Sequence, residues 1–389
     1  MQLDTIQTMA IAMLAFALGA FIKNKFEFFK KFFIPSPVIG GLLFSILVFI
    51  GKRFLDMTID FDLSLQDFFM NVFFTSIGLA ASFKSLKKAG PLGLKLSLLI
   101  ILLLPLQNIL AISLAYLFRI NPLHGLAMGS TSMTGGIGSA ISFGKIMEAL
   151  GASNNISIGV AASTFGLLIG SLVGGPVARR LIRVHKLETL GKSQIEGRKT
   201  FQNLDQKSLM KAIILISLAG LLGIFINKVL ALTRLNFPYY VGLQFAGLII
   251  RNIFDLLKKD VGMKSVETVG NISLNIFLSL ALINLNLTAI TDLALPMFII
   301  LISQAILIGL YTSLVSFRLL GANYDAAVMA AGHCGVGLGQ TPNAMANMEA
   351  IIEEKGPSDL ALFIFPLVLA ISVNLFNPLI ISLFMNFLS

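Results

Sequence analysis

Two segments of this chain are too apolar and too long for the core helices of a soluble protein. Residues 293–317 contain no charged side chain, and residues 92–118 contain one, Lys95, near their start. A helix needs about 20 predominantly apolar residues to cross a bilayer. Charged residues make up 12% of the chain, whereas a soluble protein carries about 25%. The sequence therefore predicts an all-α polytopic membrane protein, because transmembrane strands would need an alternating polarity that is absent.

Apolar segments of sufficient length recur along the whole chain. The predicted transmembrane helices lie near residues 6–22, 34–51, 68–83, 92–118, 157–178, 209–231, 237–254, 270–287, 293–317 and 360–387. Two further segments, near 124–150 and 324–350, are apolar but rich in glycine and small polar residues. These two segments are expected to be re-entrant, entering and leaving the membrane on the same side.

The basic residues indicate the orientation of these helices. The chain has 29 Lys and Arg against 19 Asp and Glu, and the basic residues cluster between the predicted helices. With the N-terminus outside, four clusters fall in inside loops, at residues 23–31, 84–88, 179–211 and 251–264. This distribution satisfies the positive-inside rule. We expect both termini outside, membrane lipid around the helices and no nucleic-acid partner.

A polar segment at 179–208 divides the chain into two similar halves. It is interpreted as a cytoplasmic linker between an N-terminal repeat, 1–178, and a C-terminal repeat, 209–389. Each repeat has five predicted transmembrane helices and one re-entrant segment. Because five is odd, the two halves must enter the membrane from opposite sides, which predicts two inverted-topology repeats. Pro35 and Pro238 open the second helix of their respective halves and support this correspondence.

The glycine-rich stretches also correspond between the halves. Each follows a long apolar helix that carries one glutamine: Gln107 precedes Gly135 by 28 residues, and Gln304 precedes Gly332 by 28. Glycine allows unusual backbone conformations and close approach to a ligand. Irregular backbone at membrane depth persists only where protein or a water-filled cavity surrounds it. Broken helices at matching places in two hydrophobic halves are typical of the binding site of a secondary transporter.

The chemistry of these stretches suits a small anionic substrate and Na⁺. Thr341 and Pro342 have the form of an N-cap and a first helical residue, and Ser139 is a candidate cap for a similar half-helix. A helix N-terminus in the membrane attracts a carboxylate, and oxygen atoms suit Na⁺ as a hard cation. The predicted substrate-binding residues are Ser132, Thr134, Gly135, Gly136, Ser139, Gly332, His333, Gly335, Thr341, Asn343 and Asn347. The predicted Na⁺ ligands are Thr131, Gly138, Gly337, Gly339 and Gln340.

Simpler interpretations apply to several other residues. His333 and Cys334 are adjacent and cannot define a catalytic dyad, so no enzymatic activity is expected, and His333 is assigned a structural hydrogen bond or a substrate contact. A repeated GxxxG pattern at residues 166–174 favours close helix packing. The polar residues on apolar helices are interpreted as hydrogen-bond links between helices; they are Gln107, Asn108 and Gln304. No acidic residue lies in mid-helix to relay protons, which favours Na⁺ as the coupling ion.

The chain resembles the glutamate:sodium symporter family. The most specific stretch runs from Asn323-Tyr324-Asp325 through Gly332-His333-Cys334-Gly335 to Asn347-Met348. Further stretches that are similar to the family occur, in the same order as in the family, at residues 3–5, 34–38, 73–79, 162–167, 174–179 and 270–274. The resemblance therefore covers nearly the whole chain. It implies Na⁺-coupled glutamate uptake across a bacterial inner membrane. It also implies a homodimer in which a mobile domain carries both re-entrant segments past a scaffold, an elevator motion.

The sequence departs from the family pattern inside the expected site. Ile137 stands where glutamate-transporting members typically have histidine, and Gln340 and Asn343 replace residues that are smaller or different. A sodium-coupled carrier of dicarboxylates or 2-hydroxycarboxylates is therefore an alternative. A passive channel is a second alternative, and an intramembrane hydrolase would need a nucleophile and base that the sequence does not offer.

Overall fold

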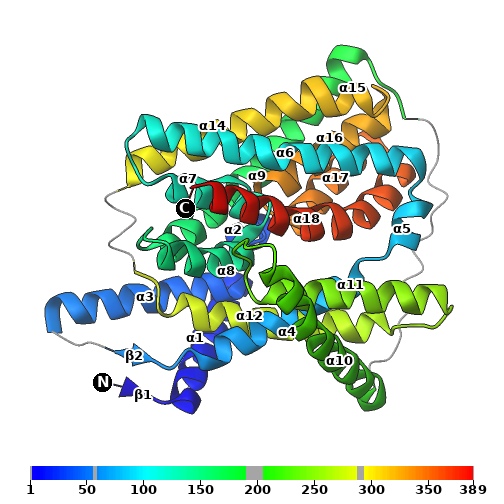
Figure 1. Cartoon of the computed structure of the whole chain (residues 1–389). Helices are drawn as coiled ribbons and strands as arrows, with labels where there is room; N and C mark the ends of the chain where they lie inside the picture. The colour runs from blue at the N-terminus through cyan, green and yellow to red at the C-terminus, as the bar shows by residue number, and fades with distance from the viewer. Residues whose placement is uncertain (1, 56–58, 190–204, 287–292, 389) are drawn as a thin grey trace. The chain divides into compact units, whose positions relative to one another are not determined.

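The computed structural model describes residues 2–55, 59–189, 205–286 and 293–388 (Figure 1). Helices account for 83% of the chain, as expected for an all-α membrane protein. The described strands are β1 (Gln2–Leu3) and β2 (Asp60–Phe61), which pair in parallel with Gln2 opposite Asp60. The helices form two compact units, and each unit takes segments from both halves of the sequence.

The first unit comprises residues 1–80, 141–158 and 204–294. Within it, α4 packs against both α11 and α12, α10 packs against α11, and α1 packs against α3. Glycines permit these close approaches, since a Cβ on Gly247 would lie 2.7 Å from the backbone oxygen of Thr75. Its helices are α1 (Thr5–Lys25), α2 (Glu27–Lys31), α3 (Ser36–Leu55), α4 (Ser64–Ala80), α10 (Gln206–Ala231), α11 (Tyr240–Leu256) and α12 (Met263–Leu282).

The second unit comprises residues 81–140, 159–203 and 295–389. Within it, α6 packs against α18 and α7, and α16 packs against α17. Three helices cross the unit boundaries: α8 belongs to this unit up to Ala140, α9 belongs to it from Gly159, and α14 belongs to it from Leu295. The elements are α5 (Phe83–Lys88), α6 (Gly90–Leu117), α7 (Pro122–Leu126), η1 (Ala127–Thr131), α8 (Gly136–Ala149), α9 (Asn155–His185), α14 (Ala294–Tyr311), η2 (Thr312–Ser316), α15 (Phe317–Leu319), α16 (Tyr324–Leu338), α17 (Thr341–Lys355) and α18 (Asp359–Leu388).

Within the described residues, each of the ten predicted transmembrane segments is largely helical, but the helices differ in length; residue 287, at the end of the segment 270–287, lies outside the described part of the chain. Among the described residues, seven helices are long and apolar enough to cross a membrane: Thr5–Lys25, Gly90–Leu117, Asn155–His185, Gln206–Ala231, Met263–Leu282, Ala294–Leu319 and Asp359–Leu388. The apolar part of α3 is shorter, Ser36–Gly51. Helices α4 and α11 have 17 residues each, or about 25 Å at 1.5 Å per residue. A multi-pass membrane protein is thus established, and the ten-helix topology stays a prediction.

Both predicted re-entrant segments are helices interrupted near their middle. The first runs through α7 and η1, breaks at residues 132–135 and continues as α8. The second runs through α16, breaks at Gly339 and Gln340 and continues as α17. An asparagine caps the start of each segment: Asn121 accepts from the Leu123 N–H and Asn323 from the Ala326 N–H, both at 2.9 Å. The breaks are where the sequence predicts them, while entry and exit on one side of the membrane stays a prediction.

The predicted linker at 179–208 is helical at both ends. Helix α9 continues to His185 and α10 begins at Gln206. The extension of α9 is tied down by Arg179, whose Nε lies 2.6 Å from an Oε of Glu354 on α17. Residues 190–204 lie outside the described part of the chain.

Candidate functional site

The first break is shaped by serine and glycine. The Ser132 hydroxyl donates to the backbone oxygens of Ala127, at 2.5 Å, and Gly159, at 2.9 Å, which fixes the chain where the helix ends. Gly136 then begins α8 with φ +70°, a conformation that glycine adopts without a steric penalty. Ser139, predicted to cap this helix, is instead its fourth residue. That prediction was wrong because the helix starts at the glycine pair rather than after it.

The second break places the helix start one residue earlier than predicted. Gln340 has an extended backbone, φ −164° and ψ 175°, and it is the N-cap of α17. Thr341 is the first helical residue and Pro342 the second, so the prediction of Thr341 as N-cap was wrong. Proline fits this early position because it needs no acceptor for an N–H. The Gln340 side chain forms no capping hydrogen bond with the described residues.

Gln107 on α6 connects the two breaks. Its Nε2 donates to the Gly337 backbone oxygen at 2.6 Å, and its Oε1 accepts from the Thr134 hydroxyl at 2.7 Å. Its own backbone oxygen accepts from Nε2 of Gln304 at 2.8 Å. The two glutamines therefore link helices, as predicted, and Gln107 also holds one residue of each broken segment. The glycine-rich stretches that correspond between the two halves are thus both hydrogen-bonded to one side chain, that of Gln107.

The breaks also touch each other directly. A Cβ on Gly136 would lie 2.9 Å from Cγ and Cδ of Gln340. A Cβ on Gly135 would lie 2.7 Å from Nδ2 of Asn377, a residue of α18. Glycine at both positions is therefore required by close neighbours, and the second unit brings the two predicted halves of the site together.

Several buried polar atoms beside the breaks have no hydrogen-bond partner among the described residues. Ser130 is positioned by its backbone: its N–H donates to Oδ1 of Asn108 at 2.8 Å, and its oxygen accepts from Nδ2 of Asn377 at 3.1 Å. Buried polar atoms without partners are rare, and a bound ion or water is one explanation for them. Those atoms are Asn108 Nδ2, Ser130 Oγ, Thr131 Oγ1, Ser139 Oγ, Asn343 Oδ1 and Asn377 Oδ1. Five of these atoms are hydroxyl or amide oxygens, the kind of ligand that Na⁺ takes.

The comparison with known proteins identifies the family. The family described as sodium/glutamate symporter matches residues 1–357. The chain belongs to this family. The chain is 37% identical over 391 residues to the sodium/glutamate symporter of Escherichia coli K12, covering 98% of both sequences. It is 35% identical over 393 residues to that of Haemophilus influenzae, covering 97% of this chain and 96% of the relative. These relatives are named as symporters and not as enzymes, which confirms the expectation of a non-enzymatic protein.

A solved structure with a partly similar arrangement is the sodium proton antiporter of Methanocaldococcus jannaschii at pH 8. It shares 16% identity, with 99% of this chain and 96% of that chain covered, and its TM-score is 0.42.

Three glycines that were predicted to line the second break lie inside α16. A Cβ on Gly332 would lie 2.6 Å from the Met348 sulfur, and one on Gly335 would lie 2.6 Å from the Ala344 backbone. Gly337 approaches Ile308 in the same way, at 2.7 Å, while its oxygen accepts from Gln107. Their placement in irregular backbone was wrong, because α16 continues to Leu338 and only Gly339 lies at the break. In this family member they serve close packing.

The predicted asparagines fasten α17 to α9. Nδ2 of Asn343 donates to the Leu167 backbone oxygen, and Nδ2 of Asn347 donates to that of Gly170, both at 2.8 Å. A Cβ on Gly174 would meet the Asn347 side chain, so the GxxxG face of α9 is a packing surface, as predicted. Oδ1 of Asn343 is buried and has no hydrogen-bond partner among the described residues.

His333 is a fully buried residue of α16. Its Nδ1 lies 3.1 Å from the Ser316 hydroxyl, and its ring meets the Tyr311 ring edge-on at 5.8 Å. The Cys334 sulfur lies 3.1 Å from the Thr312 hydroxyl. These contacts agree with the structural interpretation of His333. Gly138, a predicted ion ligand, lies in the first turn of α8.

The sequence analysis missed Ser130 and Asn377. Ser130 precedes the predicted residues of the first stretch, and Asn377 lies on the last helix, far from both stretches in sequence. A signal was present for Asn377, because an Asn-Pro pair at 377–378 lies within a largely apolar helix. Polar residues inside membrane helices face the protein interior and mark function.

Proposed function

We propose that this chain is a sodium-coupled symporter that imports glutamate or a related acidic amino acid across a bacterial inner membrane. The observation that carries the proposal is the meeting of both helix breaks in one unit, where Gln107 joins Thr134 to the Gly337 backbone. Family membership and the names of relatives at 35–37% identity support the substrate and the ion. The geometry and the family membership thus both favour a sodium-coupled symporter.

The substrate carboxylate is assigned to the start of α17. The first N–H groups of a helix have no acceptor within it and carry a partial positive charge, which suits an anion. Thr341 opens this helix and is exposed, while the neighbouring Asn343 is fully buried with its Oδ1 unpartnered. The Thr341 hydroxyl and the N-terminal N–H groups are therefore accessible to a ligand, and Gln340 and Gly136 form the adjacent wall.

Na⁺ is assigned to the first break. Thr131 Oγ1, Ser130 Oγ and Asn377 Oδ1 are neutral oxygens, buried and without a described partner. A Na⁺ ion there would lower the electrostatic cost of bringing an anion to the neighbouring helix start. Because coupling free energy is reciprocal, the anion would raise the affinity for Na⁺ by the same factor.

The composition of the two units supports an inverted repeat and an elevator motion. The first unit takes the first three long helices of each half, and the second takes both helix breaks and most of the long helices on either side of them, while residues 141–158 belong to the first unit. We assign the second unit, which carries both breaks, as the moving body and the first as the scaffold. The working form is a homodimer with both termini outside, as the resemblance and the positive-inside rule predict.

The test is uptake of radiolabelled L-glutamate by proteoliposomes containing the purified chain. We expect saturable accumulation with an inward Na⁺ gradient and none when choline replaces Na⁺. Uptake driven by a pH gradient in choline would contradict Na⁺ coupling. A panel of dicarboxylates and 2-hydroxycarboxylates distinguishes the alternative carrier, since Na⁺-driven uptake of one of these without glutamate uptake would overturn the substrate. Flux without saturation or accumulation would indicate a channel.

A further inference from the structure

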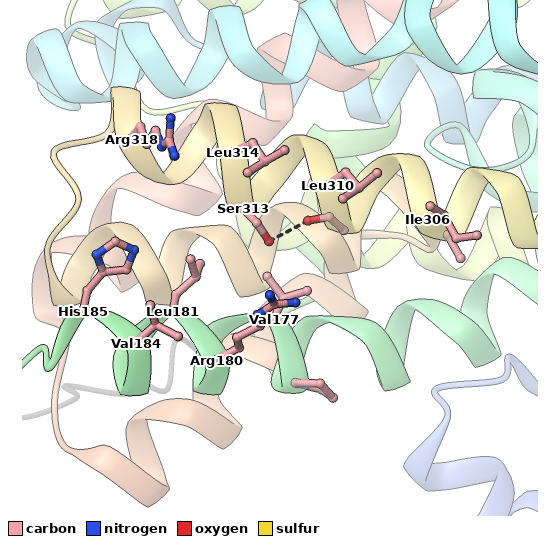
Figure 2. Close-up of a pocket in the computed structure, with 13 residues that line it drawn as sticks. Val177, Arg180, Leu181, Val184, His185, Ile306, Leu310, Ser313, Leu314 and Arg318 are labelled. Atoms are coloured by element: carbon pink, nitrogen blue, oxygen red, sulfur yellow. Dashed lines mark hydrogen bonds between the residues drawn. The ribbon is translucent and has the colours of Figure 1, made fainter.

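A groove lies between α9 and the continuous helical segment formed by α14, η2 and α15, all within the second unit. Figure 2 shows its lining residues, and its volume is about 520 Å³. Most of the wall is aliphatic, and Ile306, Leu310 and Leu314 each leave more than half of their surface exposed. Both helices are long and apolar enough to cross a membrane. The groove therefore opens on surface that faces the surroundings of the protein.

The groove also contains basic side chains. Arg180 lies on α9, and His185 and Arg318 lie toward one end of the groove in Figure 2, away from Ile306. Neither arginine forms a hydrogen bond or ion pair with any described residue, whereas the neighbouring Arg179 is paired with Glu354. The lining includes no acidic residue. Two unpaired guanidinium groups thus face an apolar trough.

One residue of the lining, Gly309, carries no side chain. Gly309 lies in the lining, and a Cβ built there would meet its nearest neighbours, Val173 and Val177, at 3.9 Å. The Ser313 hydroxyl donates to the Gly309 oxygen at 2.6 Å, so this polar group is satisfied locally (Figure 2). At the basic end the rings of His185 and Phe317 lie 5.0 Å apart and hold α9 against α15.

We propose that this groove binds one anionic phospholipid. Arg318 would hold the phosphate, Arg180, which lies nearer Val177 in Figure 2, would add positive charge further along the groove, and an acyl chain would lie along Ile306 and Leu310 over Gly309. Arginine suits phosphate because its planar guanidinium donates two parallel hydrogen bonds. The charge complementarity selects a lipid over a second copy of the chain. The predicted orientation puts this basic end at the cytoplasmic surface, where anionic lipids attract basic residues.

The test measures lipid retention by the purified full chain in detergent, using native mass spectrometry. The protein is incubated with equal amounts of phosphatidylglycerol and phosphatidylcholine that carry the same acyl chains. We expect preferential retention of one phosphatidylglycerol. Arg180→Gln/Arg318→Gln should lower that preference by roughly tenfold or more, since each basic residue near an anionic lipid contributes about a fivefold factor. The matched control, Lys84→Gln/Arg183→Gln, removes two exposed charges outside the groove and should keep the preference.

A second variant tests the apolar part of the groove separately. Gly309→Phe fills the trough without changing charge, so it should reduce retention of both lipids. An unchanged preference in Arg180→Gln/Arg318→Gln would overturn the proposal, and so would an equal loss in the control pair. A dimer that forms without bound lipid, and that dissociates only in the groove variants, would show that a second copy of the chain occupies the groove. That result would also overturn the proposal. Retention is read without transport, so failure here is distinct from failure of the proposed symport.

Discussion

At the residue scale, the candidate site depends on side chains that each form hydrogen bonds with two neighbouring residues. Gln107 is fully buried and uses its amide nitrogen for one broken segment and its amide oxygen for the other. Removing one partner of a buried hydrogen bond leaves the other group desolvated and unpaired, which costs about 1–3 kcal/mol per group. A single substitution can therefore disturb both halves of the site.

Substitution of Gln107 should weaken transport more than substitution of its neighbour Gln304. Gln107→Leu leaves the Thr134 hydroxyl and the Gly337 oxygen without their partner, so we expect the apparent KM for glutamate to rise about tenfold or more. Gln304→Leu removes only a link to the Gln107 backbone and should change KM by less than about threefold. The measurement is Na⁺-driven uptake at equal amounts of reconstituted protein. Similar KM values for the two variants would contradict a joining role for Gln107.

The effect on transport of the contact between Gly136 and Gln340 can be distinguished from the effect of backbone strain. Gly136→Ala places a methyl group against Gln340 at a residue with φ +70°. Gly151→Ala imposes comparable strain at φ +97° but has nothing within 4 Å of the added carbon. Strain of this kind costs on the order of 1–3 kcal/mol. We expect Gly136→Ala to abolish most uptake, Gly151→Ala to retain it, and Gln340→Ala to restore part of it when combined with Gly136→Ala.

Thr131 provides a test of the assigned ion position. Its Oγ1 has no described partner, so Thr131→Val removes an oxygen without leaving another group unpaired. The half-saturating Na⁺ concentration should rise roughly fivefold or more, since loss of about 1 kcal/mol of binding has that effect. Thr164→Val is the control, because that hydroxyl only bonds the Val160 oxygen of its own helix. An unchanged Na⁺ dependence in Thr131→Val would remove this residue from the ion site.

At the element scale, helix positions followed from sequence more closely than helix ends did. Within the described residues, every predicted transmembrane segment is largely helical because apolar length is a local property of the chain. The sequence analysis misplaced the start of α17 by one residue and the start of α8 by more. The position of a break depends on contacts with residues that are distant in sequence. Gln340 is extended where it meets Gly136, more than 200 positions away in sequence.

The predicted topology can be tested with single cysteines in a Cys334→Ser background. Leu232 follows α10 and is 81% exposed, and Glu188 follows α9 and is exposed. The positive-inside rule places position 232 outside and position 188 in the cytoplasm. An impermeant thiol reagent on intact cells should therefore label Leu232→Cys and not Glu188→Cys. The opposite pattern would refute the orientation, and permeabilised cells should label both as a control.

At the scale of the whole molecule, the compact units do not follow the sequence halves. Each unit interleaves corresponding helices from residues 1–178 and 209–389, and the candidate site lies in the second unit alone. On the proposed assignment, both ligands would bind one body of the protein. Binding of either ligand should stabilise that body, because a ligand that binds only the folded state shifts the unfolding equilibrium.

Glutamate should stabilise the purified protein only when Na⁺ is present. A ligand at a hundred times its Kd adds about 2.7 kcal/mol to the free energy of unfolding, so the melting temperature in NaCl should rise by roughly 5 °C. In choline chloride the rise should be much smaller, because binding of the two ligands is linked. Equal shifts in the two salts would show that glutamate binds without Na⁺ and would contradict the coupling.

The sequence by itself determined the membrane class, the helix positions and the presence of two broken segments. Uncharged runs and glycine clusters act over a few turns of chain, so their consequences are local. The tertiary structure alone decided which glycines form a break and which pack. Gly136 faces Gln340 in a break, whereas Gly332 and Gly335 allow α16 to approach its neighbours. The tertiary structure also brought Asn377 next to the first break and joined the two breaks through Gln107. The hydrogen bond from Gln107 to Gly337 spans 230 residues of sequence. Close packing and buried hydrogen bonds form only when distant segments meet, and local sequence does not specify that meeting.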